Sequence, residues 1–60
     1  MYLVDIIGII KMNMEEDKKN AAEWKLAGVD KLSTYYQGRY DAYNIILPLI
    51  KTEAFRLGQI

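Results

Sequence analysis

The sequence predicts an all-α fold, a helical hairpin, and three observations support this prediction. Apolar residues recur every three or four positions along most of the chain, which is the spacing of one helix face. Gly28 is a helix stop signal, and Asp30 two residues later is a helix start signal. Only residues 2–10 also have the composition of a strand, and the chain offers no second strand to pair with them.

The apolar segment at residues 2–10 has two interpretations. Its side chains fall at i, i+3, i+4 and i+7, as on one helix face, in the set Leu3, Ile6, Ile7 and Ile10. The same segment is rich in β-branched residues and contains Gly8, which is typical of a buried strand. We favour the helix because a lone strand needs a partner strand. A strand that pairs with its copy in a dimer remains the alternative.

The next helix is expected to begin near Asn13. An asparagine side chain accepts a hydrogen bond from an unpaired backbone amide, and Glu16 three residues later completes a capping box. The acids in the following turn favour the positive end of a helix. We interpret the acids Glu15, Glu16, Asp17 and Glu23 as a solvated helix start rather than a cation site. They lack the alternating oxygen ligands and the turn glycine of an EF-hand.

The segment Ala27-Gly-Val-Asp30 is interpreted as a short turn between two helices. Gly28 would adopt the left-handed conformation that ends a helix, and Asp30 would cap the next one. The alternative is one uninterrupted helix over residues 14–47. It is supported by a seven-residue recurrence of Ala22, Val29, Tyr36, Tyr43, Ile50 and Leu57. We favour the hairpin.

The helix expected at residues 31–47 has the clearest pattern. Its apolar stripe consists of Leu32, Tyr35, Tyr36, Tyr40, Tyr43, Ile46 and Leu47. Pro48 lacks an amide hydrogen and its ring clashes with the carbonyl of Asn44, so we expect a kinked C-terminal helix or a restart there. A helical pattern resumes at Leu49, and Gly58 is expected to end it.

Size and composition predict a single domain, residues 1–60, that forms homo-oligomers. The chain has 60 residues of which 52% are apolar, so it carries more apolar material than one small core can hide. It has neither cysteine nor histidine, which excludes disulfides and argues against a zinc or iron–sulfur site. The residues expected in self-association are Leu3, Ile6, Ile7, Ile10, Leu32, Ile46, Leu47 and Ile50.

Charge and motifs exclude several classes of function. Eight basic and eight acidic residues give a net charge of zero, which argues against a nucleic-acid binder. Residues 2–10 are too short to span a bilayer, which takes about 20 residues, and no targeting signal precedes them, so we expect a cytoplasmic protein. No catalytic pair or phosphate-binding loop is recognisable. The sequence therefore predicts a non-enzymatic protein without metal or cofactor.

A cluster of tyrosines around Arg39 is the most informative feature. Four of the five tyrosines lie within nine residues on one helix face, and tyrosine suits interfaces because its hydroxyl tolerates water. Arg39 lies inside this stripe, as in a binding hot spot, although an intramolecular ion pair is the alternative. Trp24 is expected to pack under the N-terminal segment or to anchor a partner. The predicted protein-binding residues are Tyr35, Tyr36, Arg39, Tyr40, Tyr43 and Trp24.

The stretch Tyr35-Tyr-Gln-Gly-Arg-Tyr-Asp-Ala-Tyr43, followed by Ile45-Ile-Leu47, resembles small helical open reading frames of bacteriophages and mobile elements. This resemblance covers about a quarter of the chain and assigns no site residues. It implies a small regulator or inhibitor that binds a host protein. Two alternatives remain: a structural protein that self-assembles, and a peripheral membrane protein anchored by residues 2–10.

Overall fold

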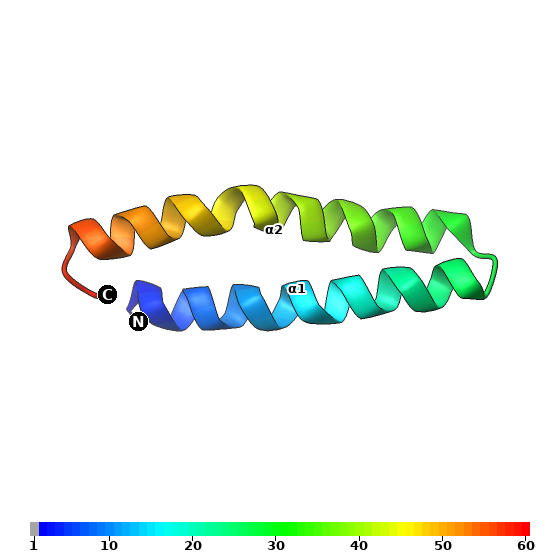
Figure 1. Cartoon of the computed structure of the whole chain (residues 1–60), viewed down its shortest axis with the longest axis horizontal. Helices are drawn as coiled ribbons and strands as arrows, with labels where there is room; N and C mark the ends of the chain where they lie inside the picture. The colour runs from blue at the N-terminus through cyan, green and yellow to red at the C-terminus, as the bar shows by residue number, and fades with distance from the viewer. Residues whose placement is uncertain (1) are drawn as a thin grey trace.

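The computed structural model describes residues 2–60, which form a hairpin of two antiparallel helices (Figure 1). Helix α1 spans Leu3–Leu26 and helix α2 spans Asp30–Arg56. The two helices lie side by side over an extent of 45 Å, so the two chain ends meet at one end of the hairpin and the turn forms the other (Figure 1). The prediction of an all-α helical hairpin is confirmed, and residues 2–60 contain no strand.

Helix α1 joins the helical segment expected at residues 2–10 to the helix expected from Asn13, with no break between them. Residues 3–10 are its first turns, so the helical interpretation of this segment is confirmed, but Asn13 lies inside the helix and is not an N-cap. Helix formation is cooperative, and an already helical segment extends through a residue that could otherwise cap it. At the true start, Tyr2 is extended and its amide lies 3.4 Å from the carboxylate of Asp5, to which it donates. The charge of Asp5 also favours the positive helix end.

The turn between the helices depends on Gly28, as predicted. Gly28 has a φ of 79°, its amide donates to the carbonyl of Lys25 at 3.1 Å, and the amide of Val29 donates to the carbonyl of Trp24 at 2.9 Å. These two hydrogen bonds form a Schellman motif, which satisfies carbonyls at the end of α1. The alternative of one long helix is therefore wrong. Asp30 is the first residue of α2 rather than its cap, since Val29 holds the N-cap position.

A second Schellman motif ends α2. Gly58 has a φ of 74°, and its amide and that of Gln59 donate to the carbonyls of Phe55 and Ala54. The helix does not restart at Pro48, which lies within α2. Both Pro48 and Asn44 are exposed, so water can reach the Asn44 carbonyl whose amide partner the proline removes.

The core is a single seam between the helices, and we name it the hairpin seam. Its residues alternate at spacings of three and four, as in a coiled coil, and all are buried or half-buried. Helix α1 contributes Leu3, Ile7, Ile10, Met14, Asp17 and Ala21, and α2 contributes Ser33, Tyr36, Tyr40, Tyr43, Leu47, Ile50 and Ala54. The recurrence noted in the sequence is real for Tyr36, Tyr43 and Ile50, whereas Ala22 and Leu57 are exposed.

Two hydrogen bonds between the helices fix their register. Near the turn, the hydroxyl of Ser33 donates to the carbonyl of Ala21 at 2.9 Å. At the open end, the amide of Leu3 donates to the side-chain oxygen of Gln59 at 2.7 Å. The second bond satisfies one of the unpaired amides at the start of α1, so the C-terminal residues cap the first helix.

The role of Gly28 can be tested against another glycine of the same chain. Gly28→Ala should destabilise the hairpin by about 1 kcal/mol, because a side chain is strained at its positive φ. Gly38 is the matched control, since it is exposed inside α2 and an added β-carbon would meet no atom within 4 Å. Gly38→Ala should stabilise by about 1 kcal/mol. Urea unfolding followed by circular dichroism measures the change in the free energy of unfolding for both variants. Changes of the same sign would contradict the role of Gly28 as the residue that ends α1.

Candidate binding surface

A partly buried ion pair joins the two helices about midway along the hairpin. The Asp17 side chain is only 4% exposed, and its Oδ2 lies 3.4 Å from Nε of Arg39, whose side chain is 40% exposed. Glu15 and Glu16 are exposed as expected, but the interpretation of Asp17 as part of a solvated helix start is wrong. The reason is its position, because residue 17 continues the three–four spacing of the seam.

Arg39 is surrounded by the tyrosines that precede it. Its guanidinium carbon lies 5.7 Å from the ring centroid of Tyr35 and 6.0 Å from that of Tyr36. The two rings meet edge to face, with centroids 5.1 Å apart. The neighbouring Tyr35 side chain, and then the charge of Asp17, raise the pKa of Arg39 above its ordinary value. The positive charge of Arg39 is thus balanced within one chain, by the faces of two tyrosine rings and by the carboxylate of Asp17. This arrangement is the intramolecular ion pair expected from the sequence as the alternative to a binding hot spot.

The ion pair is a charge–charge contact without an aligned hydrogen bond. Oδ2 of Asp17 is buried and accepts no hydrogen bond from any residue between Tyr2 and Ile60, although Nε of Arg39 lies within ion-pair distance. We infer that the N–H of Arg39 does not point at this oxygen. Removing a buried carboxylate from water is costly unless its charge is balanced. The hairpin therefore depends on Arg39 for charge balance.

The tyrosine stripe of the sequence divides into two rows. Tyr36, Tyr40 and Tyr43 belong to the hairpin seam, where they are half-buried. Tyr35 is 56% exposed and lies one position before the seam. A second row, which we name the outer row, repeats this offset along α2 with spacings of three and four: Leu32, Tyr35, Arg39, Ala42, Ile46 and Leu49. Apart from Arg39, which is half-buried, every member is exposed.

Helix α1 carries apolar residues at the same offset from its own seam. They are Tyr2, Ile6 and Ile9, each one position before Leu3, Ile7 and Ile10. In two antiparallel helices that face each other, equal offsets place residues on the same side of the hairpin. The outer row and Tyr2, Ile6 and Ile9 together form one side, which we name the outer face.

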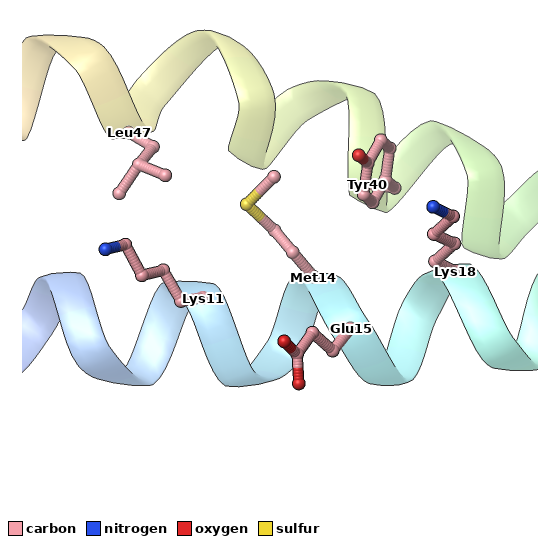
Figure 2. Close-up of a pocket in the computed structure, with 6 residues that line it drawn as sticks. All are labelled: Lys11, Met14, Glu15, Lys18, Tyr40 and Leu47. Carbon is pink, nitrogen blue, oxygen red and sulfur yellow. The ribbon is translucent and has the colours of Figure 1, made fainter.

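The opposite side of the hairpin is polar, and we name it the groove face. It carries a shallow groove of about 270 Å³ (Figure 2). The groove is lined by Lys11, Met14, Glu15, Lys18, Tyr40 and Leu47. Beyond it, Gln37 donates to the carboxylate of Asp41 at 3.1 Å on the exposed surface of α2. The groove face thus combines the charges of Lys11, Glu15 and Lys18 with apolar side chains in its groove, whereas the outer face is apolar along α2 and at the start of α1.

Some of the residues expected in self-association are buried within the hairpin, and others stay exposed and available to a partner. Ile7 and Ile10 are buried within the hairpin, and Leu3, Ile6, Leu47 and Ile50 are half-buried, whereas Leu32 and Ile46 are exposed. Ile9 and Leu49 were missed, although both follow the three–four spacing of the outer face. The apolar pattern of one helix taken alone does not show which of its apolar rows packs against the other helix.

Trp24 does not pack under the N-terminal segment, and that expectation is wrong. Because α1 is continuous, Trp24 lies 14 residues after Ile10 in the same helix, roughly 20 Å away at 1.5 Å per residue. It is 37% exposed beside the turn, where it can still contribute to a partner surface.

Searches for other kinds of site give little. Between Tyr2 and Ile60 no group of three acidic side chains could hold a metal ion, and neither helix is long and apolar enough to cross a membrane. Comparisons with protein-family models, curated proteins and solved structures find no match to this chain.

The two members of the buried ion pair should respond unequally to truncation. Arg39→Ala leaves Asp17 charged and buried without a cation, so it should lower the melting temperature clearly. Adding Asp17→Ala to this variant should restore part of the loss. Arg56→Ala is the control, because Arg56 pairs with Glu53 on the surface, where such a pair contributes little. Thermal melts of the unmodified chain, the three single variants and the double variant test this, and additive losses from Arg39→Ala and Asp17→Ala would contradict it.

Proposed function

We propose that this chain is a non-enzymatic protein–protein interaction module, a small regulator that self-associates and presents helix surface to a protein target. One observation carries the proposal. Among residues 2–60, the buried apolar side chains are only four, Ile7, Ile10, Ala21 and Ala54, while fifteen large apolar side chains are exposed. A chain that functioned alone would keep most of its apolar surface in water.

Self-association is favoured energetically because much apolar surface is exposed on the single hairpin. Burying apolar surface contributes about 25 cal/mol per Å², so a chain that leaves it in water forgoes the main driving force of folding. Domains of this size are marginal unless a disulfide, a metal or a partner subunit adds stability. The chain has no cysteine, and association is the route that its exposed residues support.

The character of the exposed surface supports binding to proteins. Tyr35 is exposed beside the half-exposed Arg39, and tyrosine and arginine are the residues that most often dominate binding energy at interfaces. Three further tyrosines lie in the adjoining hairpin seam, where they are half-buried: Tyr36, Tyr40 and Tyr43. The kink expected at Pro48 is part of the same proposal, since it would set the angle at which residues 49–56 meet a partner.

The alternative of a membrane anchor at residues 2–10 is less well supported. Ile7 and Ile10 are buried in the hairpin seam, so this segment could enter a lipid interface only if α1 first left α2. A self-assembling structural protein remains the second candidate, because the same exposed apolar surface would serve it. Capture of a specific host protein would separate a regulator from a purely structural assembly.

Self-association is directly measurable. We expect sedimentation equilibrium at micromolar concentrations to give a dimer or a larger particle, because the exposed apolar side chains gain burial only between chains. A particle of 7.0 kDa throughout that range would contradict the proposal.

The structure also separates two tyrosines that the sequence placed in one stripe. Tyr35→Ala should weaken association and leave helicity and monomer stability nearly unchanged, since Tyr35 is exposed. Tyr40→Ala removes a half-buried ring from the hairpin seam and should destabilise the fold by about 2 kcal/mol. Circular dichroism and sedimentation on both variants check this, and it would be wrong if the two substitutions had the same effect on stability.

A further inference from the structure

We propose that the outer face is the docking surface for a second copy of this chain, and that two hairpins stack through it into a four-helix bundle. This inference rests on the proposed function, because it names the partner and the surface of the self-association. It further commits to one arrangement, in which the two turns lie at the same end of the bundle.

The spacing of the outer row identifies the kind of partner. From Leu32 to Leu49 the row keeps the three–four spacing of a coiled-coil seam, one position away from the seam that α1 occupies. A helix with two such rows can pack against two helices at once. Helix α1 fills the first row, and the second row requires another helix with the same spacing. The next member of the row is Glu53, so the apolar part ends at Leu49.

The size of the face fits a second copy. The Cα trace extends 45 Å by 15 Å, so one side of the hairpin is a long and narrow surface. Stable interfaces bury about 800 Å² per partner, so the whole outer face must be used to reach this range. A hairpin of identical length is the partner that covers it completely.

Charge supports the same occupant. The outer row carries one cation, Arg39, which Asp17 balances within the chain, and the α1 side of the same face carries one exposed acid near it, Glu16. The groove face instead carries Lys11, Glu15 and Lys18. A twofold interface brings the same patch of both copies together, and a nearly neutral patch does so without like-charge repulsion.

The register selects between the two ways of stacking. Arg39 lies level with Asp17, and Gln59 lies level with Leu3, so residues 2–9 of α1 are level with the second half of α2. A twofold axis along the length of the bundle places α1 over α2 of the partner at equal level. Ile6 and Ile9 then face the partner's apolar row near Ile46 and Leu49. In the opposite stacking α1 lies over the partner's α1 and the two outer rows face each other, so the apolar end lies over Asn13, Glu16 and Asn20, and Arg39 faces no acid of α1.

The same register places one favourable charge pair across the interface. Glu16 lies next to Asp17 in sequence, one position before the seam, and is exposed on the side of the outer face. In the stacking with both turns at one end, Glu16 of each copy is level with the half-exposed guanidinium of Arg39 in the other. Each interface would contain this pair twice.

Single substitutions in the outer row test the surface. Ile46→Glu and Leu49→Glu alter side chains that are 42% and 66% exposed, so the hairpin itself should keep its helicity. Each should weaken dimerisation at least about thirtyfold, the fold-change of a hot-spot truncation. Thr34→Glu and Asn44→Glu are matched controls, because they add the same charge at exposed positions of α2 on the groove face side. These two should leave the dissociation constant unchanged.

A second measurement tests the arrangement independently of these variants. The chain has no cysteine, so Ala27→Cys in the turn gives a single labelling site. Spin labels there should lie far closer together than the 45 Å length of the hairpin. A separation near that length would overturn the proposed stacking.

The outcomes distinguish this inference from the proposed function. If the unmodified chain dimerises and the groove-face variants dissociate while the outer-row variants do not, the docking surface is wrong and self-association stands. A chain that is monomeric at all concentrations overturns both. Should Ile46→Glu or Leu49→Glu lose helicity, the spin-label distance decides.

Discussion

Two helices can touch each other along one line only, and this constraint governs the whole molecule. Each helix buries a single three–four row against its neighbour, so the described chain hides few apolar side chains however well the row is packed. Everything on the flanks of that row stays in water. The outer face, which is apolar along α2, is the flank that we propose gains most from a partner. Stability and binding thus draw on the same surface.

The buried carboxylate of Asp17, paired with the half-exposed Arg39 beside the seam, costs desolvation free energy. An apolar pair at this level would pack without any desolvation cost, so the charges are better understood as a device for specificity. The charge of Asp17 is balanced only when residue 17 is level with residue 39, and a shift of the helices by one turn would leave the carboxylate buried without its cation. With Ser33 near the turn and Gln59 at the open end, the chain fixes the helix register at three points.

The sequence predicts the hairpin well because its decisive signal is local. A glycine at positive φ needs no tertiary contact, and Gly28 ends α1 where its pattern indicates. Asn13 misleads because its capping tendency is also local but weaker than the helical segments on both sides. Asp17 is misplaced because its charge suggests solvent, although the spacing from Ile10 and Met14 runs straight through it. The division of the tyrosines between seam and outer row depends on the direction from which α1 approaches, and the pattern of α2 alone does not contain that direction.

The central claim is that this hairpin depends on another copy to cover its apolar surface. The most direct test is the melting temperature of the unmodified chain over a hundredfold range of protein concentration, followed by circular dichroism. A dimer that is more stable than its separated hairpins must melt at a higher temperature as concentration increases, because mass action favours association. The account predicts this rise. A cooperative melt at one temperature throughout the range, together with a monomeric particle, would contradict it.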